Sequence, residues 1–104
     1  MQTIGIVLDP EKMSNPDLDI RYDLPERIEE YTDVKIRECC YDYLPDQRMV
    51  IFLDTDDAQK NVGDVIQLIS SETILDNDLT DAAEIYISSL EQAELDQCTK
   101  VFPA

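Results

Sequence analysis

The sequence contains no histidine, no tryptophan and only two glycines among its 104 residues. The absence of histidine removes the commonest general base, the Ser-His and Cys-His nucleophile pairs and most zinc sites. Gly5 and Gly63 stand alone, so no glycine-rich loop can surround a phosphate group. These absences favour a binding function over catalysis, with no cofactor and no metal.

Basic residues are also scarce, because eight Lys and Arg stand against 24 Asp and Glu, for a net charge of −16. Between residues 38 and 98, fifteen carboxylates face two bases, Arg48 and Lys60. Such a field repels nucleic acid and anionic membranes, and it speeds the encounter with a basic protein. We therefore expect a cationic protein partner, with no direct binding to nucleic acid or membrane. The alternative is that the charge provides solubility alone.

Cysteine occurs three times, as Cys39, Cys40 and Cys98. An odd number with two adjacent members is no disulfide framework, and neighbouring side chains of a regular strand point to opposite faces. We expect one cysteine of the pair to be a small core residue and the other a semi-exposed strand residue. The alternative is a redox or metal pair with Cys98 as its third ligand. Free thiols, the absence of a basic signal region in Met1–Leu8 and the lack of ~18 consecutive apolar residues predict a cytoplasmic protein.

Apolar runs and turn signals predict a single domain over residues 1–104. Strands are expected at residues 3–8, 34–43, 49–53 and 84–88. One helix should start near Asp23, with Pro25 in its first turn, and a second should start at a cap formed by Asp56. In the tail, residues 90–95 are compatible with a helical turn and residues 99–102 with an edge strand.

This order of elements, β-α-β-β-α-β with a short C-terminal extension, predicts an α+β fold of the ferredoxin-like type. Two helices would cover one face of the sheet. The first and third strands are apolar throughout and should lie at its centre, whereas the second and fourth alternate and should lie at its edges.

The acidic motifs match no known cation loop. If Asp54–Asp57 opened a calcium loop, its sixth and twelfth places would need glycine and glutamate, but they hold Gln59 and Val65. The segment that starts at Asp76 fails in the same way. What remains is a set of loop carboxylates with tyrosines nearby, which suits Arg- and Lys-rich partners because charged bonds steer and tyrosine anchors. The predicted partner-binding residues are Asp54, Asp56, Asp57, Asp76, Asp78, Asp81, Glu84, Tyr41, Tyr43 and Tyr86.

Taken whole, the chain resembles the small acidic immunity proteins of bacterial contact-dependent growth inhibition and polymorphic-toxin systems. Chain size, acidity, the α+β layout and the segments Asp19–Pro25 (DIRYDLP) and Met49–Asp57 (MVIFLDTDD) carry the resemblance. It implies a cytosolic antitoxin that neutralises one cognate toxin, often a basic nuclease acting on tRNA or other RNA. The alternative is an acidic nucleic-acid mimic or regulatory adaptor that binds a host nucleic-acid-binding protein. The oligomeric state stays open.

Overall fold

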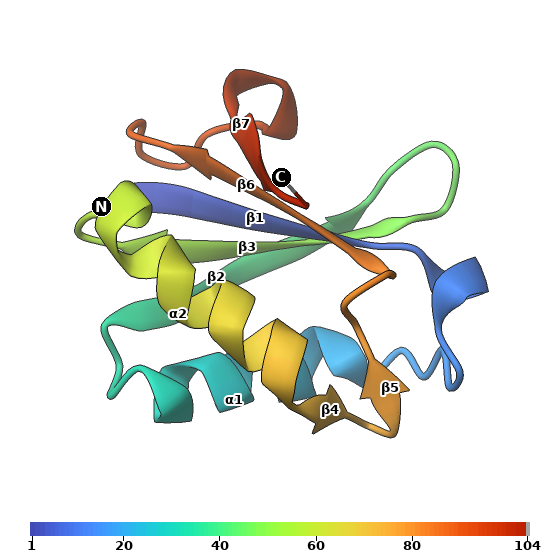
Figure 1. Ribbon diagram of the computed structural model, residues 1–104. Coiled ribbons are helices and arrows are strands. Elements are labelled where there is room, and N and C mark those ends of the chain that lie inside the picture. The colour runs from blue at the N-terminus through green and yellow to red at the C-terminus, as the bar shows by residue number, and fades with distance from the viewer. Residues whose placement is uncertain (104) are drawn as a thin grey trace.

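Two helices cover one face of a five-stranded antiparallel sheet in the computed structural model, which describes residues 1–103 (Figure 1). The strands, in sheet order, are β2 (Ile36–Tyr43), β3 (Met49–Thr55), β1 (Gln2–Leu8), β6 (Ala83–Ser88) and β7 (Thr99–Phe102). The helices are α1 (Ile20–Tyr31) and α2 (Ala58–Ser71). A small hairpin follows α2, formed by β4 (Thr73–Ile74) and β5 (Asn77–Asp78), and two 3₁₀ turns occur at Pro10–Lys12 and Leu95–Gln97.

The hydrophobic core lies between the helices and the sheet. Ile4, Ile6 and Leu8 of β1 face the helices and pair with Leu53, Ile51 and Met49 of β3. From the other side α1 and α2 contribute side chains that are almost fully buried: Leu24, Ile28, Val65, Leu68 and Ile69. Neither helix in the described part of the chain has the length and apolar character needed to span a membrane.

The sheet confirms the α+β class and the two helices on one face, but its order is not the classic ferredoxin-like arrangement. β7 adds a fifth strand beside β6, which was wrongly expected to be an edge. The alternation in β6 has another origin. Ile85 points into the core, while Glu84 and Tyr86 lie on the face without helices. Alternation of apolar and polar residues indicates that one face of a strand is exposed to solvent. It does not indicate whether the strand has a neighbour on both sides.

Both helix starts differ from the prediction. α1 begins at Ile20, so Pro25 lies inside the helix. In α2 the N-cap is Asp57, whose side chain accepts a hydrogen bond from the Lys60 N–H at 3.1 Å, whereas Asp56 accepts from the Asn61 side chain at 3.0 Å. Asp57 has the extended backbone that a cap requires.

The hairpin β4–β5 was not predicted, because its turn lacks glycine. Leu75 and Asp76 at the tip both have positive φ, 49° and 66°, which is the conformation of a two-residue type I′ turn. Elsewhere α1 lies beside β2, where the Glu29 carboxylate accepts a hydrogen bond from the Glu38 N–H at 2.8 Å.

Candidate functional site

The face of the sheet opposite the helices is partly covered by the segment 89–98, which returns over β1. Thr3 holds this segment from below, because its hydroxyl donates to the Leu90 carbonyl at 2.9 Å and accepts from the Ala93 N–H at 3.1 Å. Leu95 lies over Gly5, where a Cβ would meet its side chain at 3.5 Å. The segment therefore forms a raised wall on this face of the sheet.

Between this wall and β2 lies a groove of about 420 Å³, here called the acidic groove. It is lined by Thr3, Cys39, Cys40, Tyr41, Asp42, Phe52, Asp54, Gln92, Ala93 and Glu94. Three of these residues are carboxylates and none is basic. Phe52 is half-buried and opposes Gly5 in the sheet, so the groove combines an aromatic ring with concentrated negative charge.

Two carboxylates of the acidic groove, Asp42 and Glu94, make local hydrogen bonds. Asp42 accepts the Tyr43 N–H at 2.8 Å. Glu94 forms a capping box with Gln97, whose side chain accepts the Glu94 N–H at 2.9 Å. The ion pairs within residues 1–103 join Arg27 to Glu72, Arg48 to Asp46 and Glu84, and Lys100 to Glu84. No carboxylate of the groove takes part in them.

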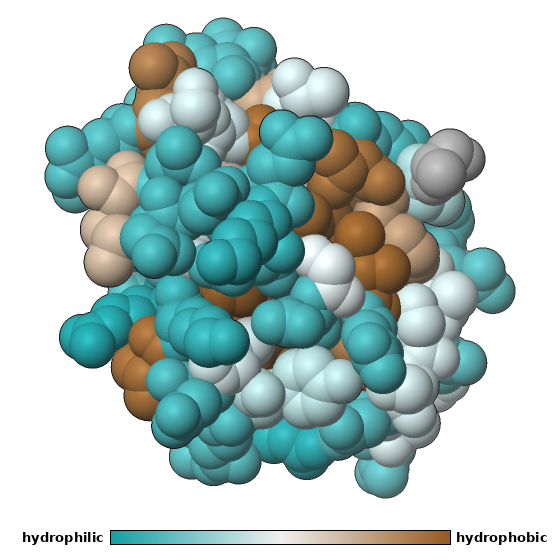
Figure 2. All heavy atoms as spheres, turned by 60° about the vertical axis from the view of Figure 1, so that its left-hand side comes forward, coloured by the Kyte–Doolittle hydropathy of each residue, from teal (hydrophilic) through white to brown (hydrophobic). Residues whose placement is uncertain are grey.

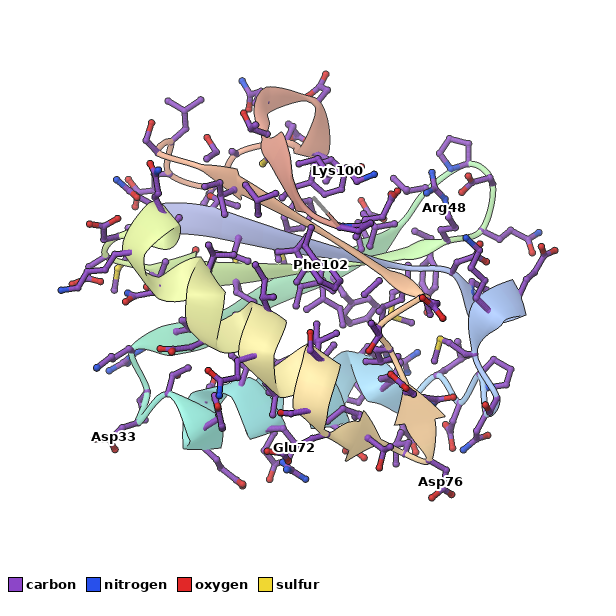
Figure 3. All side chains as sticks on the ribbon, viewed as in Figure 1. Asp33, Arg48, Glu72, Asp76, Lys100 and Phe102 are labelled. Carbon is purple, nitrogen blue, oxygen red and sulfur yellow. The ribbon has the colours of Figure 1, made fainter. Side chains whose placement is uncertain are left out.

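Glu84 and Tyr86 share the same face of the sheet as the groove, but the negative charge of Glu84 is already paired with two basic side chains. Glu84 lies 3.4 Å from Arg48 and 3.2 Å from Lys100, and it accepts the Tyr86 hydroxyl at 3.2 Å. Arg48 and Lys100 are on the side of the sheet away from α1 and α2 (Figure 3). Partial burial raises the pKa of Glu84, but the bonds from Lys100 and Tyr86 outweigh it and lower the pKa overall. This network stabilises the sheet and leaves little free charge.

Tyr41 and Tyr43 lie at the edge of the sheet, in a group of side chains that also includes Arg21 and Tyr22 of α1. Tyr22 and Tyr41 meet edge to face with centroids 6.1 Å apart, and Tyr41 and Tyr43 do so at 6.2 Å. The Arg21 guanidinium lies 4.8 Å from the Tyr22 ring centre and 5.2 Å from that of Tyr41. Its proximity lowers the pKa of Tyr22. We call Arg21, Tyr22, Tyr41 and Tyr43 the Arg21–tyrosine cluster; all three rings are at least 40% exposed.

The remaining predicted residues lie apart from the groove. Asp56 and Asp57 are exposed at the start of α2, where Asp57 is the cap. Asp76 is at the tip of the β4–β5 hairpin, which follows the end of α2 (Figure 3). Asp78 ends β5, and Asp81 lies between β5 and β6. Asp78 is occupied locally, because the Thr80 hydroxyl donates to it at 2.6 Å and lowers its pKa. The ten predicted residues therefore do not form one surface.

A second hollow, of about 590 Å³, lies between the start of α2 and strands β6 and β7. Its lining includes apolar Ile87, Leu90 and Val101 and a single carboxylate, Asp57. The face that contains the start of α2 is mostly hydrophilic around a smaller hydrophobic area (Figure 2). This hollow lacks the concentration of carboxylates that distinguishes the acidic groove.

Within residues 1–103 no three His, Cys, Asp or Glu side chains are placed to hold a metal ion.

Sequence reasoning found Asp54 and Tyr41 of the groove but missed Asp42, Phe52 and Glu94. No protein-family model, curated protein or solved structure matches the chain. The fold defines an α+β protein with a five-stranded antiparallel sheet and an acidic groove on its open face.

Proposed function

We propose that the chain binds a cationic protein through the acidic groove and so neutralises it, as an immunity protein neutralises a basic nuclease or tRNase toxin. The observation that carries this proposal is a groove of about 420 Å³ lined by Asp42, Asp54 and Glu94 with no basic residue. A lysine or arginine side chain fits such a site because charge-assisted hydrogen bonds to carboxylates are roughly twice as strong as neutral ones.

The walls of the groove give a cationic side chain a second kind of contact. Phe52 is half-buried in the groove, so its ring can meet the face of a guanidinium group, a contact worth about 0.5–2 kcal/mol depending on desolvation. Tyr41 lines the groove and belongs to the Arg21–tyrosine cluster. Tyrosine and arginine are enriched among the residues that dominate protein interfaces, so this cluster extends the proposed contact area beyond the charges.

The net charge of the chain acts at longer range. With −16 in total and only Asp46, Glu72 and Glu84 in ion pairs within residues 1–103, most of the negative field is uncompensated. Such a field raises association rates with a basic partner and falls with ionic strength. A toxin whose own basic surface binds RNA would be covered on that surface, which would block its substrate.

The test compares the association of two triple variants with the product of the gene directly upstream of the chain, which the proposal expects to encode the toxin. The groove variant carries Asp42→Asn, Asp54→Asn and Glu94→Gln, which keep the acceptor oxygens of Asp42 and Glu94. The control carries Glu11→Gln, Glu26→Gln and Glu30→Gln, which are exposed and make the same change in net charge. We expect the groove variant to associate on the order of ten- to a hundredfold more slowly at low salt, and the control severalfold at most.

The outcomes test the groove as the binding site and the toxin as the partner separately. Equal slowing of both variants would assign the effect to overall charge and refute the groove as the site. If the wild-type chain forms no complex with that gene product, the toxin assignment is wrong. A pull-down that instead recovers a DNA- or RNA-binding protein of the host would favour the mimic or adaptor.

A further inference from the structure

The adjacent cysteines lie at an irregularity of β2. Glu38 pairs with Leu53 of β3, and Cys40 pairs with the next residue of β3, Phe52. Cys39 is therefore an extra residue without a partner, which is the definition of a β-bulge. In a regular strand, neighbouring side chains point to opposite faces, but the additional residue breaks this alternation.

The bulge brings both thiols to one side. The sulfurs of Cys39 and Cys40 lie 3.5 Å apart, and both residues line the acidic groove. Both also line a smaller hollow of about 290 Å³ next to the Arg21–tyrosine cluster. Cys40 is exposed and Cys39 half-buried, so reagents reach them from solvent. The expectation that one of the pair would be a core residue is wrong.

The backbone disfavours a disulfide between these two sulfurs. Neighbouring Cα atoms are about 3.8 Å apart, below the roughly 4.4–6.8 Å found across ordinary disulfides. Within residues 1–103 no third side chain completes a metal site with the pair. Cys98 has its own contact, since its thiol lies 3.4 Å from the Glu94 carbonyl. The pair therefore suits a centre that takes two sulfur ligands from the protein and whose remaining bonds are to its own substituents.

We propose that Cys39 and Cys40 form a chelating dithiol site for trivalent arsenic compounds and similar thiophilic centres. With phenylarsine oxide as the probe, both S–H bonds and the arsenic–oxygen bond break, and two arsenic–sulfur bonds form. The two protons leave with the oxygen as water, and arsenic stays trivalent, so no oxidant or reductant is needed. Sulfur is a soft ligand and binds soft centres such as trivalent arsenic preferentially.

The surroundings of Cys39 favour its protonated thiol. Burial, the neighbouring Cys40 thiol and the Asp54 charge raise the pKa of Cys39 to about 12. Since the thiolate is the reactive species in alkylation and oxidation, the raised pKa slows both reactions at Cys39. Arsenic exchange removes the protons as water, and the second sulfur captures the centre after the first. The pair is thus selective for acceptors that bind two sulfurs.

The experiment is titration of the whole chain with phenylarsine oxide, read by intact mass and by displacement with a competing dithiol. The wild type should take up one phenylarsenic group. Cys39→Ser and Cys40→Ser should each weaken retention by about 10²–10⁴-fold, since a linked second site raises avidity by this order. Cys98→Ser is the matched control and should bind as the wild type does. Circular dichroism checks that each variant is folded.

Four results would overturn the inference. Three are no adduct on the wild type, full retention by either single variant of the pair, and loss of the adduct in Cys98→Ser. The fourth is an X-ray absorption spectrum at the arsenic edge that shows fewer than two sulfur neighbours. The measurement needs no protein partner. Its failure therefore leaves the groove proposal intact, and failure of the toxin complex does not affect the dithiol site.

Discussion

The wall of the acidic groove depends on one hydroxyl, and replacing Thr3 by valine tests this dependence. Thr3 is 1% exposed and bridges the Leu90 carbonyl and the Ala93 N–H. Valine has almost the same shape, so apolar packing is retained while both hydrogen bonds are lost. Each bond contributes about 1 kcal/mol, and the buried N–H left without a partner adds to the loss, so we expect a decrease of about 2–3 kcal/mol in the free energy of unfolding.

A loss of this size is large for a domain of 104 residues. Small domains have unfolding free energies of about 5–15 kcal/mol, and 1 kcal/mol shifts Tm by roughly 4–8 °C at this size. Urea unfolding gives the free energy, and hydrogen exchange of the Ala93 amide reports whether the wall has loosened. Thr73→Val is the control, because Thr73 is exposed. A free energy within about 0.5 kcal/mol of the wild type, with Ala93 still protected, would refute the reasoning.

Two further predictions concern helix capping and pH. Asp57→Ala should lower the free energy of unfolding by about 1 kcal/mol in urea unfolding, because it removes the cap of α2; a larger loss from Asp56→Ala would contradict the assignment of the cap. Hydrogen bonds from Arg48 and Thr80 lower the pKa values of Asp46 and Asp78 respectively. The contribution of these bonds to the stability of the fold is therefore present above the ordinary pKa of 3.8 and is lost as the pH falls below it. Unfolding followed between pH 5 and 2 should show this loss, and it should be weaker in Asp46→Asn, Asp78→Asn; an unchanged pH dependence would count against both bonds.

Local apolar patterns were enough to predict the central strands. Residues 3–8 and 49–53 are continuous apolar runs, and both became strands covered by the helices on one face. The α+β class followed from them. Residues 99–102 are too few for their pattern to separate a strand from a coil, and it is the pairing with β6 that makes them a strand.

The groove could not be predicted because it depends on contacts between distant parts of the chain. Glu94 reaches the groove only because Thr3 holds a segment that lies some ninety residues further along the sequence. The position of the cysteine pair depends on a mismatch in register between β2 and β3, which no local pattern at Cys39 and Cys40 encodes. The contact of Arg21 with Tyr41 likewise joins a helix to a strand.

The outer edge of β2 carries a further consequence. An edge strand with free N–H groups is a template on which another chain can add a strand, and this is a route to fibrils. Here the Glu38 N–H is bonded to the Glu29 carboxylate and the Tyr43 N–H to Asp42. An approaching strand therefore finds two of the donors it needs already engaged, each by a negatively charged group that it would have to displace. Strand-to-strand polymerisation through the edge of β2 should therefore be disfavoured even when the chain is concentrated.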